Sequence, residues 1–241
     1  MANSMLFCLL KSSVSNPRVC RSAVPGTIRQ ELKDPFLLAA IALVLVFGFY
    51  GIHWGRVETW HPDQMALRGD IDDQWFHPGK FLKPPFHIYL NFFLAYKPAK
   101  VLAGIFNISR EATNTIILVW SRALTVLLFS GSVVLLYLLG RQFFGQVSGR
   151  IISLLYATSA GFVAFSHFLT ADIPVMFWML AAFYFAAKIL LEPACLYYVL
   201  TGLLTGIAAA TKYNGLAIGV AIPIAHVLSH FDLETSPFKV S

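Results

Sequence analysis

Charged side chains are scarce in this sequence. Only 12% of its 241 residues are Asp, Glu, Lys or Arg, against roughly 25% in ordinary soluble domains. Hydrophobic residues make up 57% of the chain, and its mean hydropathy is +0.68. This composition excludes a disordered chain, a nucleic-acid-binding tail and an ordinary soluble domain.

Sequence signatures of soluble enzymes and metal sites are also missing. The three cysteines, Cys8, Cys20 and Cys195, have neither metal-ligand nor redox spacing. The motifs G-x-x-x-x-G-K-[ST], H-E-x-x-H and G-x-S-x-G are absent, so phosphate-loop, zincin and serine-hydrolase chemistry has no support. The acids at 70–73 are typical of a solvated face rather than a metal cage, and no metal site is predicted.

Long apolar runs are what the sequence does have. Several approach the roughly 20 residues that a helix needs to cross a bilayer. The net charge of +6 comes from basic residues that flank these runs, which indicates membrane topology and lipid headgroups rather than nucleic acid. We therefore predict an all-α fold, a polytopic transmembrane helical bundle, with spans at about 35–54, 116–140, 151–168, 171–191, 195–211 and 214–230.

The ends of the chain are predicted to lie outside the bundle. Residues 1–34 are basic, and we expect them to be cytoplasmic. Asp34 followed by Pro35 predicts the start of the first helix, with Asp34 as its N-cap. Residues 231–241 form a C-terminal tail after the last span.

A long first outer loop is predicted at about 55–115. Its first part, 55–83, is polar, whereas 84–106 is apolar but contains Lys97, Pro98 and Lys100. We expect 84–106 to be an interfacial or re-entrant segment that does not cross. This topology leaves the basic turn at 141–150 inside, as the positive-inside rule prefers.

Two motifs of that loop carry candidate chemistry. In W-H-P-D-Q (60–64), Asp63 suits a general base or a ligand for a divalent cation, although the same residues fit a helix N-cap. In K-F-L-K-P-P-F-H (80–87), Lys83 precedes a rigid Pro-Pro step and suits capture of a lipid phosphate. The alternative for Lys83 is a lysine that snorkels to the interface.

Further ionisable residues interrupt or enter the apolar runs, where a charge is costly and therefore suggests function. His167 and Asp172 lie in F-S-H-F-L-T-A-D-I-P (165–174), where capping of the next helix is the alternative role for Asp172. Lys212 lies in T-K-Y-N-G between two apolar runs, and Arg122 lies inside the span 116–140. Both cations are expected to face a partner, a cavity or a phosphate rather than lipid.

Taken in order, these motifs and the turn Y-L-L-G-R-Q-F-F-G resemble one family. From about residue 35 to 230 the chain is similar to the N-terminal half of GT-C glycosyltransferases of the protein O-mannosyltransferase and aminoarabinose-transferase type. This resemblance implies inverting transfer of a sugar, such as mannose, from a polyprenyl-phosphate donor. The acceptor would be a protein, lipid or glycan on the outer or luminal side.

The resemblance also implies roles for single residues. Asp63 matches the aspartate that deprotonates or positions the acceptor, and Lys83 matches a lysine that contacts lipid phosphate. The remaining matches are implied to bind substrate: Arg122, His167, Asp172, Lys212 and Tyr213. No cofactor is required, although a divalent metal is compatible with this family. Gln64 replaces the glutamate that commonly follows the first aspartate.

Location and partners follow from the same resemblance. The chain is expected in the plasma membrane of a prokaryote or in the endoplasmic reticulum membrane of a eukaryote, in contact with membrane lipids. Because the family usually continues through further spans, we expect the tail to be truncated or a second subunit to complete the protein. A transporter-like protein and a non-catalytic membrane subunit are the alternatives.

Overall fold

The computed structural model describes residues 31–55 and 84–230, and every regular element in these ranges is a helix. The all-α prediction is therefore confirmed. The elements are α4 (Pro35–Phe49), α6 (Phe86–Asn91), the π-helix η1 (Phe92–Tyr96), α7 (Lys97–Phe106), α8 (Arg110–Phe144), α9 (Gln146–Ala157), α10 (Ala160–Ser166), α11 (Asp172–Leu191), α12 (Cys195–Thr211), the 3₁₀-helix η2 (Tyr213–Val220) and α13 (Ala221–His230).

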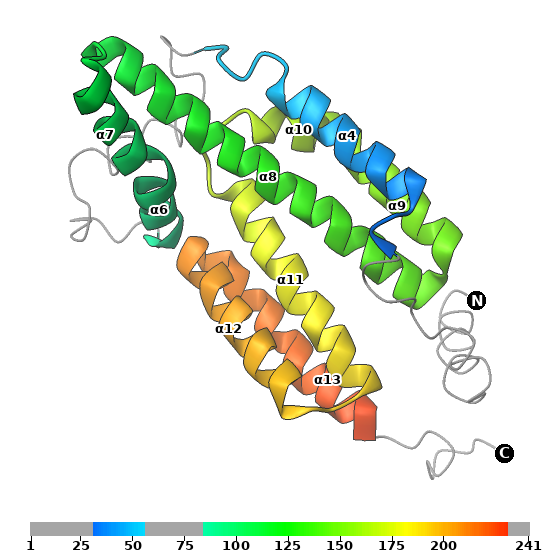
Figure 1. Cartoon of the computed structure of the whole chain (residues 1–241). Coiled ribbons are helices and arrows are strands. Elements are labelled where there is room, and N and C mark those ends of the chain that lie inside the picture. Colours follow the sequence, from blue (N-terminus) through cyan, green and yellow to red (C-terminus); the bar gives the residue numbers. More distant parts are fainter. Residues whose placement is uncertain (1–30, 56–83, 231–241) are drawn as a thin grey trace, which may run out of the picture.

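Helix α8 is the centre of the bundle. Helices α4 and α9 pack against it on one side and α11 on the other, while α12 and α13 pack against α11 (Figure 1). Side chains from α4, α8, α9 and α11 form the main apolar core, which includes Leu37, Val44, Phe129, Val133, Tyr137, Tyr156 and Ile173. The chain thus folds as a helical membrane bundle.

Among the described residues, two helices, α8 and α11, are long and apolar enough to cross a membrane, and α9 with α10 makes a third candidate if this bent pair is one span. The two helices of the pair meet at 56°, so the predicted span 151–168 is bent. Helices α4 and α12 are apolar but shorter, with 15 and 17 residues. The predicted span 214–230 divides into η2 and α13, because Pro223 fits only the first turn of a helix.

Helix α4 begins as predicted. Asp34 is its N-cap and accepts a hydrogen bond from the Phe36 amide at 2.9 Å. Its Oδ2 also accepts from Tyr137, Gln146 and Arg150 at 3.0, 3.1 and 3.0 Å. Burial would raise the pKa of Asp34, but hydrogen bonds, led by that of Arg150, hold it well below its usual range. The start of α4 is thereby joined to the end of α8 and the start of α9.

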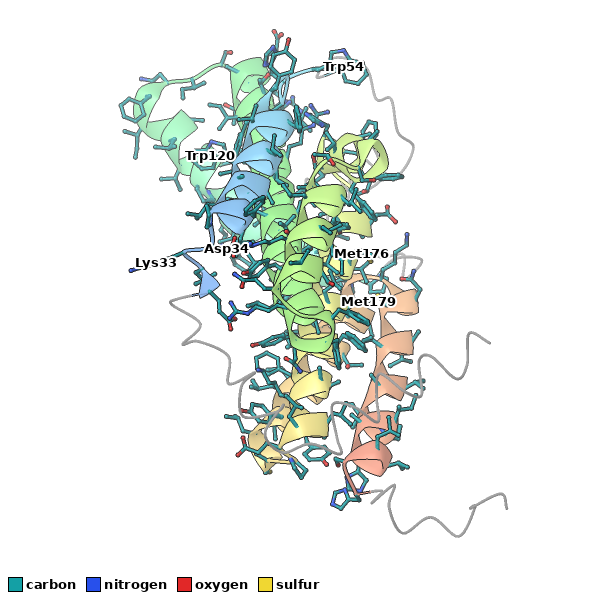
Figure 2. All side chains as sticks on the ribbon, turned by 90° about the vertical axis from the view of Figure 1, so that its right-hand side faces the viewer. Lys33, Asp34, Trp54, Trp120, Met176 and Met179 are labelled. Atoms are coloured by element: carbon teal, nitrogen blue, oxygen red, sulfur yellow. The ribbon has the colours of Figure 1, made fainter. Side chains whose placement is uncertain are left out.

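A second ion pair lies at the same end of the bundle, where Arg141 is 3.6 Å from Glu31. The sequence pattern indicated only a role in topology for the arginines of this turn, whereas the structure gives each an acidic partner from residues 31–34. Figure 2 shows Asp34 and Trp54 at opposite ends of α4. The parts of the bundle beside these two ends of α4 are called the Asp34 end and the Trp54 end below.

Helices α8 and α9 approach each other closely at two glycines. A Cβ on Gly149 would lie 2.8 Å from the Tyr137 carbonyl oxygen and 3.0 Å from the Arg141 amide nitrogen. Because these are backbone atoms of α8, they cannot move aside as the end of a flexible side chain would. A Cβ on Gly140 would in turn lie 3.0 Å from the Gly149 Cα. The absence of side chains therefore sets the distance between these helices.

We expect Gly149→Ala to destabilise the bundle by about 1–3 kcal/mol, because the added methyl forces α8 and α9 apart. Thermal unfolding of the purified protein in detergent measures this as a lower midpoint. Gly161→Ala is the matched control, since nothing lies within 4 Å of a Cβ at that position. Equal unfolding midpoints for the two variants would contradict the close approach.

The segment after the outer loop is helical throughout. Helices α6 and α7, joined by η1, lie beside the N-terminal part of α8 (Figure 1). The wide turn of η1 precedes Pro98, which has no amide hydrogen to continue the α-helical ladder. Lys97 places its ammonium 5.5 Å from the centre of the Phe92 ring. That this segment does not cross the membrane stays a prediction.

Candidate functional site

Four predicted site residues lie toward the Trp54 end of the bundle, in two sets of contacts. They are called the polar cluster here: Arg122, His167, Asp172 and Lys212. Arg122 comes from α8, His167 from the end of α10, Asp172 from the start of α11 and Lys212 from the end of α12. Asp172 meets Lys212, while Arg122 and His167 both contact the chain just after α4. Segments far apart in sequence thus supply the partners in each set.

Asp172 and Lys212 form the ion pair of the cluster. The Lys212 Nζ donates to the Asp172 Oδ1 at 2.6 Å, and the two side chains are 35% (Asp172) and 42% (Lys212) exposed. The N-cap of α11 is Ala171, so Asp172 lies in the first helical turn and does not cap the helix by its side chain. The positive end of the helix dipole favours a carboxylate there. Because both groups are partly exposed, a ligand can reach the pair.

The end of α12 explains the position of Lys212. Its backbone is extended, with φ −155° and ψ 133°, so the helix ends at this residue. Gly215 then packs directly on the backbone of Ala208, an approach that leaves no room for a Cβ. Tyr213 begins η2 and is 60% exposed. This tight reversal holds Lys212 at the exposed end of the helix.

Arg122 is buried, with 2% of its surface exposed. Its Nη1 donates to the carbonyl oxygens of Ile52 at 2.7 Å and Trp54 at 2.6 Å. Those carbonyls follow the end of α4, where Gly51 has φ +68° and turns the chain. Arg122 therefore holds the first residues of the loop that leads to Asp63.

His167 contacts the same stretch from α10. Its Nε2 lies 3.0 Å from the Tyr50 carbonyl oxygen and its Nδ1 lies 2.9 Å from the Val163 carbonyl oxygen. A neutral imidazole has one N–H and donates to one of these oxygens, whereas the cation donates to both. His167 and Arg122 together fasten residues 50–54 to two different helices.

Two of the predicted residues, Asp63 and Lys83, lie outside the described residues. The structure does place the chain that directly follows Lys83. Pro84 is buried, and the Phe86 ring packs edge-on against Trp178 of α11, with ring centres 5.9 Å apart. The K-P-P step therefore leads into a segment that packs on α11, the helix that begins with Asp172.

A buried polar pair on α6 was not singled out from the sequence. His87 and Asn91 are 1% and 0% exposed. The Asn91 side-chain amide donates to the His87 carbonyl oxygen and faces the His87 Nε2, both at 2.9 Å. The amide thus makes Nε2 an acceptor and assigns the ring proton to Nδ1. The i, i+4 spacing was the available signal, but such a pair is common on any helix.

The described residues contain no group of three or more His, Cys, Asp or Glu side chains placed to hold a metal ion. The polar cluster itself contains two cations, Arg122 and Lys212, an imidazole and a carboxylate. A lysine ammonium at a helix end offsets the charge of a bound phosphate. The Asp172 carboxylate competes for that ammonium, which keeps Lys212 in place when no anion is bound.

Comparison with known proteins identifies the family. A family model described as dolichyl-phosphate-mannose-protein mannosyltransferase matches residues 99–237, more than half of the chain. The match includes the whole polar cluster but neither Asp63 nor Lys83. No curated protein and no solved structure matched the chain. The chain is an integral membrane protein and belongs to the dolichyl-phosphate-mannose-protein mannosyltransferase family, whose members are membrane glycosyltransferases of the GT-C type.

Proposed function

We propose that the chain takes part in transfer of a hexose, such as mannose, from a polyprenyl-phosphate donor to a hydroxyl group of a protein, lipid or glycan. Transfer takes place on the outer or luminal side and inverts the configuration at the sugar C1. The observation that supports this proposal is the partly exposed Asp172–Lys212 pair, which lies at the same end of the bundle as the anchored start of the Asp63 loop.

The proposed reaction is a single displacement. The acceptor hydroxyl oxygen attacks C1 from the side opposite the phosphate, and the bond from C1 to the phosphate oxygen breaks. The polyprenyl phosphate leaves with the electron pair of that bond, and Asp63 takes the proton of the hydroxyl. Lys83 and Lys212 lower the barrier because their charges oppose the charge that develops on the leaving phosphate.

The remaining residues position these groups. Asp172 holds the Lys212 ammonium until the phosphate draws it away. Tyr213 follows Lys212 in the chain and is exposed, and we assign it a contact with the donor. Arg122 and His167 hold the beginning of the outer loop, and we assign them a positioning role in place of the substrate contact that the sequence analysis expected. Arg122 and His167 already contact backbone carbonyl oxygens of the chain. In a positioning role, both side chains keep these contacts throughout sugar transfer.

A transporter-like role has less support. A charged pathway requires ionisable groups between the helices in the middle of the membrane. In the structure Asp172 begins α11, Lys212 follows the last residue of α12, and both side chains are partly exposed. This arrangement suits a site at one end of the bundle.

Replacement of Lys212 tests the proposal. We expect Lys212→Ala to raise the apparent KM for the polyprenyl-phosphate sugar about tenfold, because one charge-assisted contact of about 1.5 kcal/mol is lost. The KM for the acceptor is expected to stay unchanged. Initial rates are measured in lipid nanodiscs that contain the donor, with any partner subunit that co-purifies.

Lys188→Ala is the matched control, since Lys188 lies on α11 in the last turn, with its ammonium 5.1 Å from the Tyr184 ring centre. Its donor KM is expected to equal that of the wild type. An unchanged donor KM together with an unchanged kcat in Lys212→Ala would remove Lys212 from the phosphate site. Absence of transfer by the wild type and by every co-purified assembly would favour a non-catalytic membrane subunit.

A further inference from the structure

Two histidines near the end of α13 face each other. His226 and His230 are four residues apart, which places them on the same face of the helix. Their ring centres are 4.4 Å apart and the ring planes are inclined by 49°. Both residues are exposed. The pair lies far from the polar cluster, because its partner Tyr198 precedes Lys212 by 14 residues, about 21 Å along the α12 axis.

The inner ring nitrogens of both histidines are occupied. The His230 Nδ1 lies 2.9 Å from the His226 carbonyl oxygen, which can only accept, so this nitrogen carries the proton. It also lies 3.0 Å from the Ser229 hydroxyl. The His226 Nδ1 lies 2.7 Å from the Tyr198 hydroxyl, which accepts from it when the proton is on Nδ1. In this arrangement the lone pair of each ring is on Nε2.

Such contacts are typical of histidines that bind metal ions. A metal-binding imidazole usually donates its second nitrogen to a carbonyl, carboxylate or water, which fixes the tautomer and the ring orientation. Here the second nitrogen of His230 contacts a backbone carbonyl oxygen, and that of His226 contacts a tyrosine hydroxyl. Two metal–nitrogen bonds of about 2.1 Å at a tetrahedral angle require nitrogens about 3.4 Å apart, which the 4.4 Å separation of the ring centres permits.

We propose that His226 and His230 bind a transition-metal ion through their Nε2 atoms. Within the part of the chain that the structure describes, no third His, Cys, Asp or Glu joins them, so water completes the coordination shell. Imidazole ligands suit Zn²⁺ and Cu²⁺, and Cu²⁺ forms the tighter complex. The ion would link successive turns of α13 and, through Tyr198, brace α13 against α12.

The test uses the full chain without a histidine tag, purified in detergent, and Zn²⁺ as the probe in isothermal titration calorimetry. We expect one site, and we expect His226→Ala and His230→Ala each to weaken it by about tenfold or more. Tyr198→Phe should weaken it by about tenfold, because it removes the group that orients His226. Electron paramagnetic resonance of the Cu²⁺ complex should show two coupled nitrogens.

Two controls separate this site from the other histidines of the chain. The combined change of Leu228→His and His230→Leu keeps the total at seven histidines but puts the two imidazoles two residues apart on different faces of α13, so it should lose the site. His53→Ala removes an exposed histidine after α4 and should bind Zn²⁺ as the wild type does. Wild-type affinity in the combined variant, or loss of binding in His53→Ala, would overturn the proposal.

Discussion

Asp63→Asn is expected to lower the rate of sugar transfer by about 10²–10⁴-fold, because an amide cannot accept the proton of the acceptor hydroxyl. The change keeps the size and shape of the side chain, so membrane insertion and the thermal unfolding midpoint should equal those of the wild type. Transfer is measured with saturating donor, which makes the loss appear in kcat rather than in the KM for the donor.

Asp70→Asn provides the matched control. It removes an acid from the same loop, at a position where the sequence indicates a solvated face. We expect its transfer rate to stay within about twofold of the wild type, since exposed charges contribute little. Full activity of Asp63→Asn would remove Asp63 from the mechanism, and equal losses in both variants would indicate a general effect of loop charge.

Helix positions follow from the sequence because the membrane imposes one rule on long apolar runs. A backbone without water must satisfy its own hydrogen bonds, so such runs become helices. The predicted spans 35–54, 116–140, 171–191 and 195–211 accordingly overlap α4, α8, α11 and α12. The bend after Ala157 was not predicted. Thr158 and Ser159 lie at the bend and Gly161 follows it, but without a proline or a charge they were counted as part of one span.

The sequence marks Arg122 and Lys212 as cations that need partners, but it does not say what the partners are. An isolated cation in an apolar run signals that a partner exists, which identified Arg122 and Lys212. The partners of Arg122 are backbone carbonyls, which every residue has and which no sequence pattern marks. The partner of Lys212 is 40 residues away, and only the fold of α11 against α12 brings Asp172 to it.

Arg122→Met is expected to destabilise the protein by about 3 kcal/mol even when no donor is present. The carbonyls of Ile52 and Trp54 lose their donor, and a hydrogen bond to a charged group contributes about 1.5–3 kcal/mol. The loop that begins there should be cut faster by a protease in the native membrane protein. Sugar transfer should fall with it, because Asp63 follows this anchored stretch.

This outcome distinguishes a positioning role from direct contact with the donor phosphate. A phosphate ligand would raise the donor KM in Arg122→Met while leaving the unfolding midpoint and the cleavage rate of the donor-free protein unchanged. Arg122→Lys sharpens the comparison, because its ammonium keeps the charge but cannot reproduce the planar donor geometry of arginine, so intermediate stability is expected. Arg110→Met, at an exposed position of the same helix, should match the wild type in all three measurements. If Arg122→Met retains wild-type stability and loop protection, Arg122 does not hold the loop, and a raised donor KM in the same variant would assign it to the phosphate.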